Sequence, residues 1–569
     1  MHFSTNQIPL RTLIEQFNKE DISLPPWQRP FVWKIQKTLN LLDSLYRKYP
    51  IGVIYLWQPS QGSQLRPKKR TFRGRGKTIL QFPLKYLIDG QQRLTALEAA
   101  FGLSEAFTQN GRTLECFLDL KSEDFRGGRD TRLFRSPAKK MTPDPEMDTD
   151  LSHLWIRDIW RCDSDADYHK LRTEREEQLR DEGWEESAIQ IAMARIDAVQ
   201  NILKINIPCV TISKMVDKQV VQVFKRLNGG AGLRKGDLRA ADLGTGPSVD
   251  VLEQMRRFVQ EDLPSRLGFS FLFAFRTLVV FHKRTARFNS LPPDWAQDKG
   301  LDDRSLKQSW ESAEKSLRKA MGFVESEMGW SRRGVLPSAN ALIPFAFAID
   351  FANGVMDERN KLDYKRWLCL TSLRGIWRGS VETTIDKFLR KFKDINNRPG
   401  ALLLSALKKD QRRQIDADEE IDVSSPVWGP VTQIMLAWLV NINGKDWASG
   451  EKIISLVNGG DKGSRTGRIT VHHIFPRKFL ANLDYATDYI NCPANYALLS
   501  GETNSKFKDS PPDEVLKQLD AKGRKSGRMQ FFQSDAANLL KEDQYEVFCS
   551  WRAKQLAKAL NEWLQLPIK

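Results

Sequence analysis

The sequence predicts an α+β protein made of several domains. Its 569 residues exceed the length at which one hydrophobic core stops growing and chains divide into domains. Short apolar strands followed by turns and helices occur near both ends of the chain, whereas apolar residues recur at helical spacing through its middle. We therefore expect three domains, which we place at residues 1–245, 246–410 and 411–569.

The amino-terminal part contains a predicted strand, turn and helix. Leu84 to Ile88 form a short apolar run, Gly90 follows as a turn residue, and Leu94 and Leu97 fall on one face of the next helix. A helix begins with free backbone N–H groups and attracts anions such as nucleotide phosphates. The acidic residue before the glycine could hold a cation that bridges those phosphates. Taken alone, however, a polar turn that caps a helix is the simpler explanation.

Helices and one further strand are predicted for the middle of the chain. Residues 167–204 are rich in charged residues, Gln and Ala with spaced Leu and Ile, which predicts one or two long amphipathic helices. Residues 205–213 predict a strand that leads to the segment around Asn228. Residues 250–406 predict a helical connector. The charged run at 408–422 predicts a solvated linker, and its acidic cluster is better explained as surface charge than as a metal site.

Two adjacent histidines are the most informative feature, because the chain contains only six. His472 and His473 are followed by a proline that ends the strand, and then by Asn495, Asn504 and Lys506. Phosphodiester hydrolysis needs a base that deprotonates water and a divalent cation that holds the phosphate. Neighbouring side chains on a strand point to opposite faces, so the two histidines must have different roles. The alternative is an ordinary, partly buried strand end.

These residues resemble the HNH, or ββα-metal, nucleases, whose motif runs His-Ile-x-Pro, Asn-x-x-x-Leu and then an Asn beside a Lys. The resemblance implies that His473 is the general base and that His472 and Asn504 bind the metal. It also implies that Asn495 braces the loop of the base and that Lys506 contacts phosphate. Many members carry an acid where His472 stands. Because imidazole also accepts softer ions, the metal could be Mg²⁺ or Mn²⁺, or another divalent cation such as Ni²⁺ or Zn²⁺.

Three segments near the other end resemble the amino-terminal domain of the GmrSD family of modification-dependent restriction endonucleases, whose core is ParB/sulfiredoxin-like. They are a Gln-Arg-x-x-x-Trp segment, an Asp-Gly-Gln-Gln-Arg segment and the block at 223–233. The resemblance implies binding and hydrolysis of a nucleoside triphosphate, ATP or GTP. The residues expected to form the nucleotide site are Gln28, Arg29, Trp33, Asp89, Gly90, Gln91, Gln92, Arg93 and Asn228.

Composition narrows the class of protein further. A formal charge of +17 favours a polyanionic partner without distinguishing DNA from RNA. No apolar run reaches the roughly 18 residues that a membrane span needs, and the amino terminus lacks the features of a signal peptide. The six cysteines form no CxxC pair, which predicts reduced thiols of a cytoplasmic protein and a nuclease site held by packing alone. Tryptophans expected in the core include Trp155, Trp160, Trp367 and Trp438.

We interpret the chain as a defence nuclease in which a ParB-like nucleotide-binding domain and a helical connector precede an HNH domain with surrounding helices. By the resemblance it would cut or nick DNA, foreign or modified, under nucleotide control. Two alternatives stay open: a nucleotide-switched DNA-binding protein that does not cleave, and a nuclease that cleaves RNA to arrest growth. The sequence does not identify the DNA modification or the nucleotide, nor whether the nucleotide activates or inhibits cleavage. It also leaves the oligomeric state open, and the protein could form a homo-oligomer.

Overall fold

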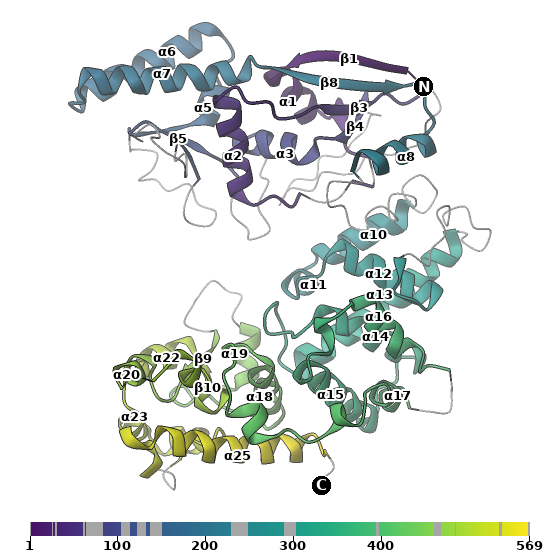
Figure 1. Ribbon diagram of the computed structural model, residues 1–569, viewed down its shortest axis with the longest axis vertical. Coiled ribbons are helices and arrows are strands. Elements are labelled where there is room, and N and C mark those ends of the chain that lie inside the picture. Colours follow the sequence, from purple (N-terminus) through teal and green to yellow (C-terminus); the bar gives the residue numbers. More distant parts are fainter. Residues whose placement is uncertain are drawn as a thin grey trace. The chain divides into compact units, whose positions relative to one another are not determined.

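The chain divides into two compact units, Met1–Val249 and Asp250–Lys569 (Figure 1). The predicted boundary at 245/246 lies close to this division, whereas the predicted boundary at 410/411 falls inside the second unit. None of the described helices is both long enough and apolar enough to cross a membrane. The computed structural model describes residues 2–25, 27–28, 31–60, 63, 84–103, 114–121, 133–136, 151–228, 249–288, 303–393, 398–459, 468–483, 485–533 and 538–566.

A five-stranded sheet lies in the first unit (Figure 1). Its strands are β1 (His2–Pro9), β2 (Ile22–Ser23), β3 (Ile54–Trp57), β4 (Lys85–Asp89) and β8 (Asn206–Ser213). Their order in the sheet is β1-β8-β3-β4-β2. β1 is antiparallel to β8, β8 is parallel to β3, β3 is antiparallel to β4, and β2 is parallel to β4. The strands predicted from the apolar runs at 84–88 and 205–213 are β4 and β8.

Helices of the first unit pack their apolar faces into one hydrophobic core with strands of this sheet. They are α1 (Leu10–Asn18), α2 (Ile35–Tyr46), α3 (Gln91–Ala100), α5 (Ile156–Trp160), α6 (Asp165–Asp181) and α7 (Glu186–Leu203). In α1, the buried residues Leu10, Leu13, Ile14 and Phe17 recur at helical spacing. The helices α6 and α7 confirm that 167–204 is helical. A smaller sheet contains β6 (Phe134–Arg135), β5 (Phe117–Asp119) and β7 (His153–Trp155), and α8 (Asp217–Asn228) follows β8.

The first half of the second unit is helical, as the sequence predicts. Its elements are α10 (Val249–Gln260), α11 (Asp262–Arg266), α12 (Phe271–Lys283), α13 (Asp303–Ser326), η3 (Ala339–Ala341), α14 (Leu342–Phe351), α15 (Glu358–Leu373), η4 (Ile376–Arg378), α16 (Val381–Leu389) and α17 (Pro399–Ser405). The side chains of Ser270, Asp357 and Ser380 cap the amino termini of α12, α15 and α16.

The segment 408–422 is packed and is not the solvated linker that its charge predicts. It contains a turn of π-helix, η6 (Ala417–Ile421), which packs against α25 (Tyr545–Trp563). The isoleucine that ends η6 is fully buried. Glu420 forms an ion pair with Arg374, and both side chains are largely buried. The prediction failed because it weighed the density of charge and not the apolar residues between the charges.

An antiparallel pair of strands, enclosed by helices, lies in the rest of the second unit (Figure 1). The elements here are η5 (Asp410–Arg412), α18 (Pro430–Asn441), α19 (Ile453–Gly459), β9 (Ile469–His473), α20 (Arg477–Asn482), α21 (Thr487–Ile490), η7 (Pro493–Asn495), β10 (Tyr496–Ser500), α22 (Gly501–Phe507), α23 (Pro512–Gln518), α24 (Ala521–Arg528) and η9 (Glu542–Gln544). The four tryptophans predicted to be core residues of the chain are all buried.

Candidate functional site

The two adjacent histidines lie at the end of a strand pair that continues directly into a helix. β9 pairs antiparallel with β10, and His473 stands opposite Tyr496. α22 follows β10 without a gap, and Ser500 caps it by accepting a hydrogen bond from a backbone N–H of its first turn. This ββα arrangement brings His472 on β9 next to Asn504 on α22. The structure therefore places the two predicted metal ligands together.

His472 is held as a neutral imidazole. Its side chain is 2% exposed, and its Nδ1 lies 3.0 Å from Asn504 Oδ1. The pKa of His472 is lowered to about 4, mainly by burial and in smaller part by the neighbouring His473, whereas the contact with Asn504 opposes the shift. The indole ring of Trp447 stands edge-on to the imidazole, with 6.0 Å between ring centroids. A neutral imidazole is the state that can bind a metal.

His473 has different partners, as expected for neighbours on a strand. Its Nε2 lies 3.1 Å from Asn491 Oδ1, and its ring stands edge-on to Tyr496 at 5.1 Å. Because a carboxamide oxygen only accepts hydrogen bonds, Nε2 carries the proton and Nδ1 is the basic nitrogen. Burial lowers the pKa of His473 and Arg477 adds to this shift, which Asn491 partly opposes. The imidazole is therefore neutral and able to accept a proton.

Asn495 braces the turn that follows the histidines. It is fully buried, its Oδ1 accepts a hydrogen bond from Phe475 N at 2.8 Å, and its Nδ2 donates to Phe475 O at 3.1 Å and to Ile490 O at 3.3 Å. Its own backbone oxygen accepts a hydrogen bond from Ile474 N. These contacts fix the chain immediately after His473, so Asn495 positions the histidine segment.

Asp446 holds the start of α22, and no motif in the sequence singles it out. It is fully buried, and its carboxylate accepts hydrogen bonds from Ser500 N at 2.7 Å and Thr503 Oγ1 at 2.5 Å. Burial alone would raise the pKa of Asp446, but hydrogen bonds from Thr503, Ser449 and Ser500 lower it below its ordinary value. The carboxylate therefore fixes the helix that carries Asn504.

Two other buried residues support the strand β10, and both lie far from it in the sequence. The Gln530 side chain pairs with β10 as a neighbouring strand would. Its Oε1 accepts a hydrogen bond from Leu498 N at 2.8 Å, and its Nε2 donates one to Leu498 O at 3.0 Å. Arg552 on α25 donates to Ala494 O at 2.6 Å and to Tyr496 O at 2.8 Å. Only the folded structure reveals these contacts, since no local pattern predicts them.

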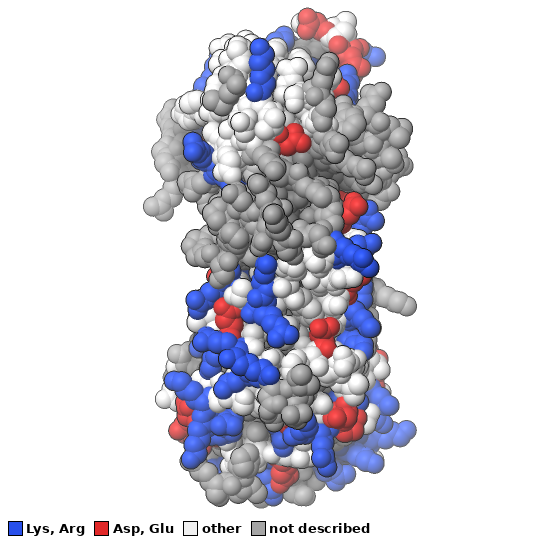
Figure 2. Space-filling model, turned by 90° about the vertical axis from the view of Figure 1, so that its right-hand side faces the viewer, with Lys and Arg blue, Asp and Glu red and all other residues white. Residues whose placement is uncertain are grey.

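Exposed basic side chains surround the strand pair. Lys506 on α22 is exposed, with its Nζ 5.2 Å from the Phe507 ring. Arg477 and Lys478 on α20 and Lys508 after α22 are also exposed. Figure 2 shows the second unit from the side on which Figure 1 draws α17, away from the strand pair, and lysine and arginine side chains are more frequent than acidic ones on this face too. Such a surface suits a polyanion.

The predicted nucleotide-binding segments of the first unit also meet. Trp27 and Ile88, which directly precede the first two segments, share an apolar cluster with Phe224 of the third, and the ring centroids of Trp27 and Phe224 are 6.4 Å apart. The buried Gln28 side chain donates to Leu87 O at 2.9 Å and to Ile88 O at 3.0 Å. The three segments are therefore neighbours in the fold although they span about two hundred residues of sequence.

Gly90 and Arg93 have structural roles at the start of α3. Gly90 has a left-handed φ of 105°, and a Cβ there would lie 2.3 Å from Ile54 Cδ1. The guanidinium of Arg93 donates to Ile51 O, Val53 O and Asp89 at distances of 2.7 to 3.0 Å. In this structure Arg93 therefore fixes the loop before β3 and pairs with Asp89.

The remaining predicted residues of this site have different surroundings. Gln92 Oε1 accepts a hydrogen bond from Val32 N at 2.9 Å, which ties the segment before α2 to α3. Gln91 is buried at the first position of α3, and Trp33 packs at the edge of the core. Arg29 and the side chain of Asn228, together with residues 229–233, lie outside the described residues.

Comparison with known families identifies the first unit. Residues 10–244 match the family model of the GmrSD restriction endonuclease, N-terminal domain. This part of the chain is therefore similar to the N-terminal domain of GmrSD restriction endonucleases. Comparison with curated proteins gives no match.

Proposed function

We propose that the protein is a nucleotide-regulated DNA endonuclease of antiphage defence, with an HNH centre in its second unit and foreign or modified DNA as its target. One observation carries this proposal: the ββα element places His472 and Asn504 side by side, with His473 as the next residue. Basic side chains around this element supply the charge that binds DNA backbone. The GmrSD-type domain supports the assignment to defence.

The side chains fit a divalent metal centre. His472 and Asn504 would hold the ion: His472 Nδ1 and Asn504 Oδ1 lie 3.0 Å apart, and both are metal-binding atoms once the imidazole proton is on Nε2. Such an ion stabilises the charge that develops on the scissile phosphate. The nitrogen donor extends the choice beyond Mg²⁺ to Mn²⁺ and Ni²⁺. His473 Nδ1 would take the proton from the attacking water, Asn491 would orient the imidazole, and Lys506 would contact phosphate.

Nucleotide control would reside in the first unit. The amino terminus of α3 and the segments around Trp33 and Asn228 would bind ATP or GTP. Asp89 would hold the cation that accompanies the phosphates. Arg93 would act indirectly, since it already holds the loop at 51–53. The convergence of three distant segments on this region supports the proposal.

Cleavage of supercoiled plasmid and of modified phage DNA tests the nuclease assignment. We expect wild-type protein to cleave with Mg²⁺ or Mn²⁺, and His473→Ala to lose a factor of about a hundred or more in rate. His282→Ala is the matched control, because this partly buried histidine on α12 bonds Ser309 on α13 and is not part of the ββα element. It should cleave as wild type does. Asp89→Asn should cleave but respond less to ATP and GTP.

Three results would contradict the proposal. Equal rates for wild type and His473→Ala would remove the assigned base. Tight DNA binding without cleavage, at any metal or nucleotide, would favour a nucleotide-switched binding protein. Cleavage of RNA with no cleavage of duplex DNA would favour a growth-arrest nuclease.

A further inference from the structure

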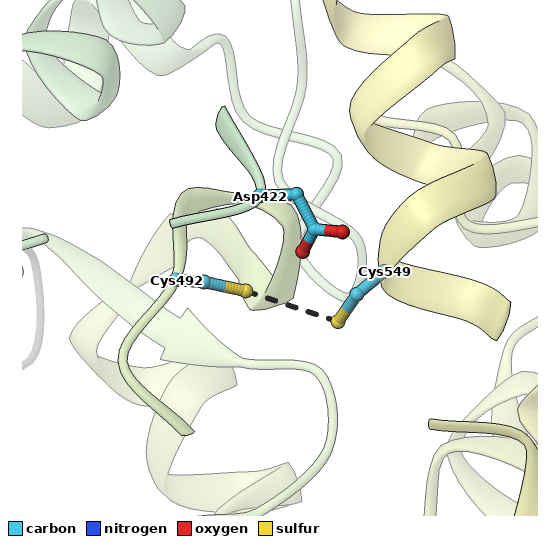
Figure 3. A group of neighbouring side chains, drawn as sticks. All are labelled: Asp422, Cys492 and Cys549. Atoms are coloured by element: carbon cyan, nitrogen blue, oxygen red, sulfur yellow. Dashed lines mark hydrogen bonds between the residues drawn. The ribbon is translucent and has the colours of Figure 1, made fainter. Parts of the chain in front are cut away.

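Two cysteines and an aspartate from distant parts of the second unit converge on one point. Asp422 follows η6, Cys492 precedes η7, and Cys549 lies on α25. One donor atom of each lies within 4.8 Å of the others. Figure 3 shows the two sulfur atoms facing each other and the carboxylate directed toward them. The sequence predicts six unrelated thiols, so this group is visible only in the fold.

The spacing of the sulfur atoms matches tetrahedral metal coordination. Zinc binds thiolate sulfur at about 2.3 Å, so two thiolates on a tetrahedral ion stand about 3.8 Å apart. The Sγ atoms of Cys492 and Cys549 are 3.8 Å apart. A disulfide would require about 2.05 Å between them. The present positions therefore suit a shared ion without movement of either side chain.

The surroundings of the group favour a bound cation whose complex with these ligands carries a net negative charge. Cys492 and Cys549 are both buried. The fully buried guanidinium of Arg552 lies one helical turn after Cys549, and within the described part of the chain it donates its hydrogen bonds to main-chain carbonyls. A zinc ion with two thiolates and one carboxylate has a net charge of −1, which would compensate this buried cation.

We propose that Asp422, Cys492 and Cys549 form a zinc site with an open fourth position that water occupies, and that the ion stabilises the fold. The site is separate from the proposed catalytic centre and does not depend on it. Zinc here would join η6, the segment before η7 and α25. Because Cys492 adjoins Asn491, which bonds His473, and begins the turn that ends at Asn495, the ion would also stabilise the segment that holds the catalytic histidine.

Metal analysis of the full chain tests this site without any measurement of cleavage. After purification and exposure to a weak chelator, we expect one zinc ion per chain in wild type and none in Cys549→Ala. Cys369→Ala is the matched control, because Cys369 is another fully buried cysteine of the second unit, and it should retain zinc. His472→Ala should also retain it, which separates this site from the proposed nuclease metal.

Two further measurements keep the proposal testable if Cys549→Ala does not fold. Asp422→Asn should bind zinc roughly tenfold more weakly or worse in chelator competition, since even groups that only orient ligands change affinity by that factor. Cobalt-loaded wild type should show thiolate-to-cobalt charge-transfer absorption that Asp422→Asn perturbs and Cys369→Ala preserves. Zinc-free wild type, a Cys492–Cys549 disulfide in its mass spectrum, or equal zinc content in wild type and folded Cys549→Ala would overturn the proposal.

Discussion

Replacement of Asn495 by alanine should open the segment that follows the two histidines. The substitution leaves the Phe475 N–H and the Phe475 and Ile490 carbonyls without the partners that Asn495 provides in a fully buried environment. A buried polar group that loses its partner costs about 1–3 kcal/mol. Because the turn relaxes in part, we expect a loss of about 3 kcal/mol in the local free energy of opening.

Amide hydrogen exchange measures this loss at the affected residues. About 3 kcal/mol corresponds to a decrease of about a hundredfold in protection, which should appear at Ile474 and Phe475. Asn504→Ala is the matched control. It removes the contact with His472 from a partly exposed side chain and should cost about 1 kcal/mol or less, although it removes a proposed metal ligand. Unchanged protection in Asn495→Ala, or an equal loss of protection in both variants, would refute the assignment of Asn495 to bracing the segment and of Asn504 to binding the metal.

Two other predictions concern stability. Gly90→Ala should destabilise the first unit by about 1–3 kcal/mol, because φ is 105° and the new Cβ would meet Ile54; its urea transition should shift while that of the second unit does not. The pKa of His472 is lowered from 6.5 to about 4 in the folded protein. Its neutral form therefore contributes fully to the free energy of unfolding above pH 6.5, and roughly 3 kcal/mol of this contribution is lost as the pH falls toward 4. Unfolding of wild type and His472→Gln across this range should show that difference shrinking, and a constant difference would contradict it.

The sequence predicts well those features that depend on neighbours along the chain. The strand at 84–88, the helices of 167–204 and the strand at 205–213 follow from periodicity, and the structure confirms them. The pairing of His472 with Asn504 and the bracing by Asn495 agree with the motif spacing. Each of these inferences needed only local conformation and a family pattern.

The features that sequence reasoning missed depend on packing between distant segments. Asp446 lies 57 positions before the Thr503 hydroxyl that it accepts from, and the same separation divides Cys492 from Cys549. A buried carboxylate and a surface one look identical in sequence. The same limitation explains the segment 408–422, whose charges predict solvent although Glu420 forms a largely buried ion pair.

Hydrogen bonds between residues before and after position 410 explain why the predicted connector and nuclease segments form one unit. Trp330 Nε1 donates to Gln433 O at 2.9 Å, and Arg366 on α15 donates to Leu564 O at the end of α25. An isolated pair of strands is at best marginally stable in water, so β9 and β10 need the helices around them. Because α18 is buried on almost every side, a fragment that begins at residue 411 would expose it. The histidine site therefore depends on the whole second unit, and the physically meaningful division of the chain lies near residue 249.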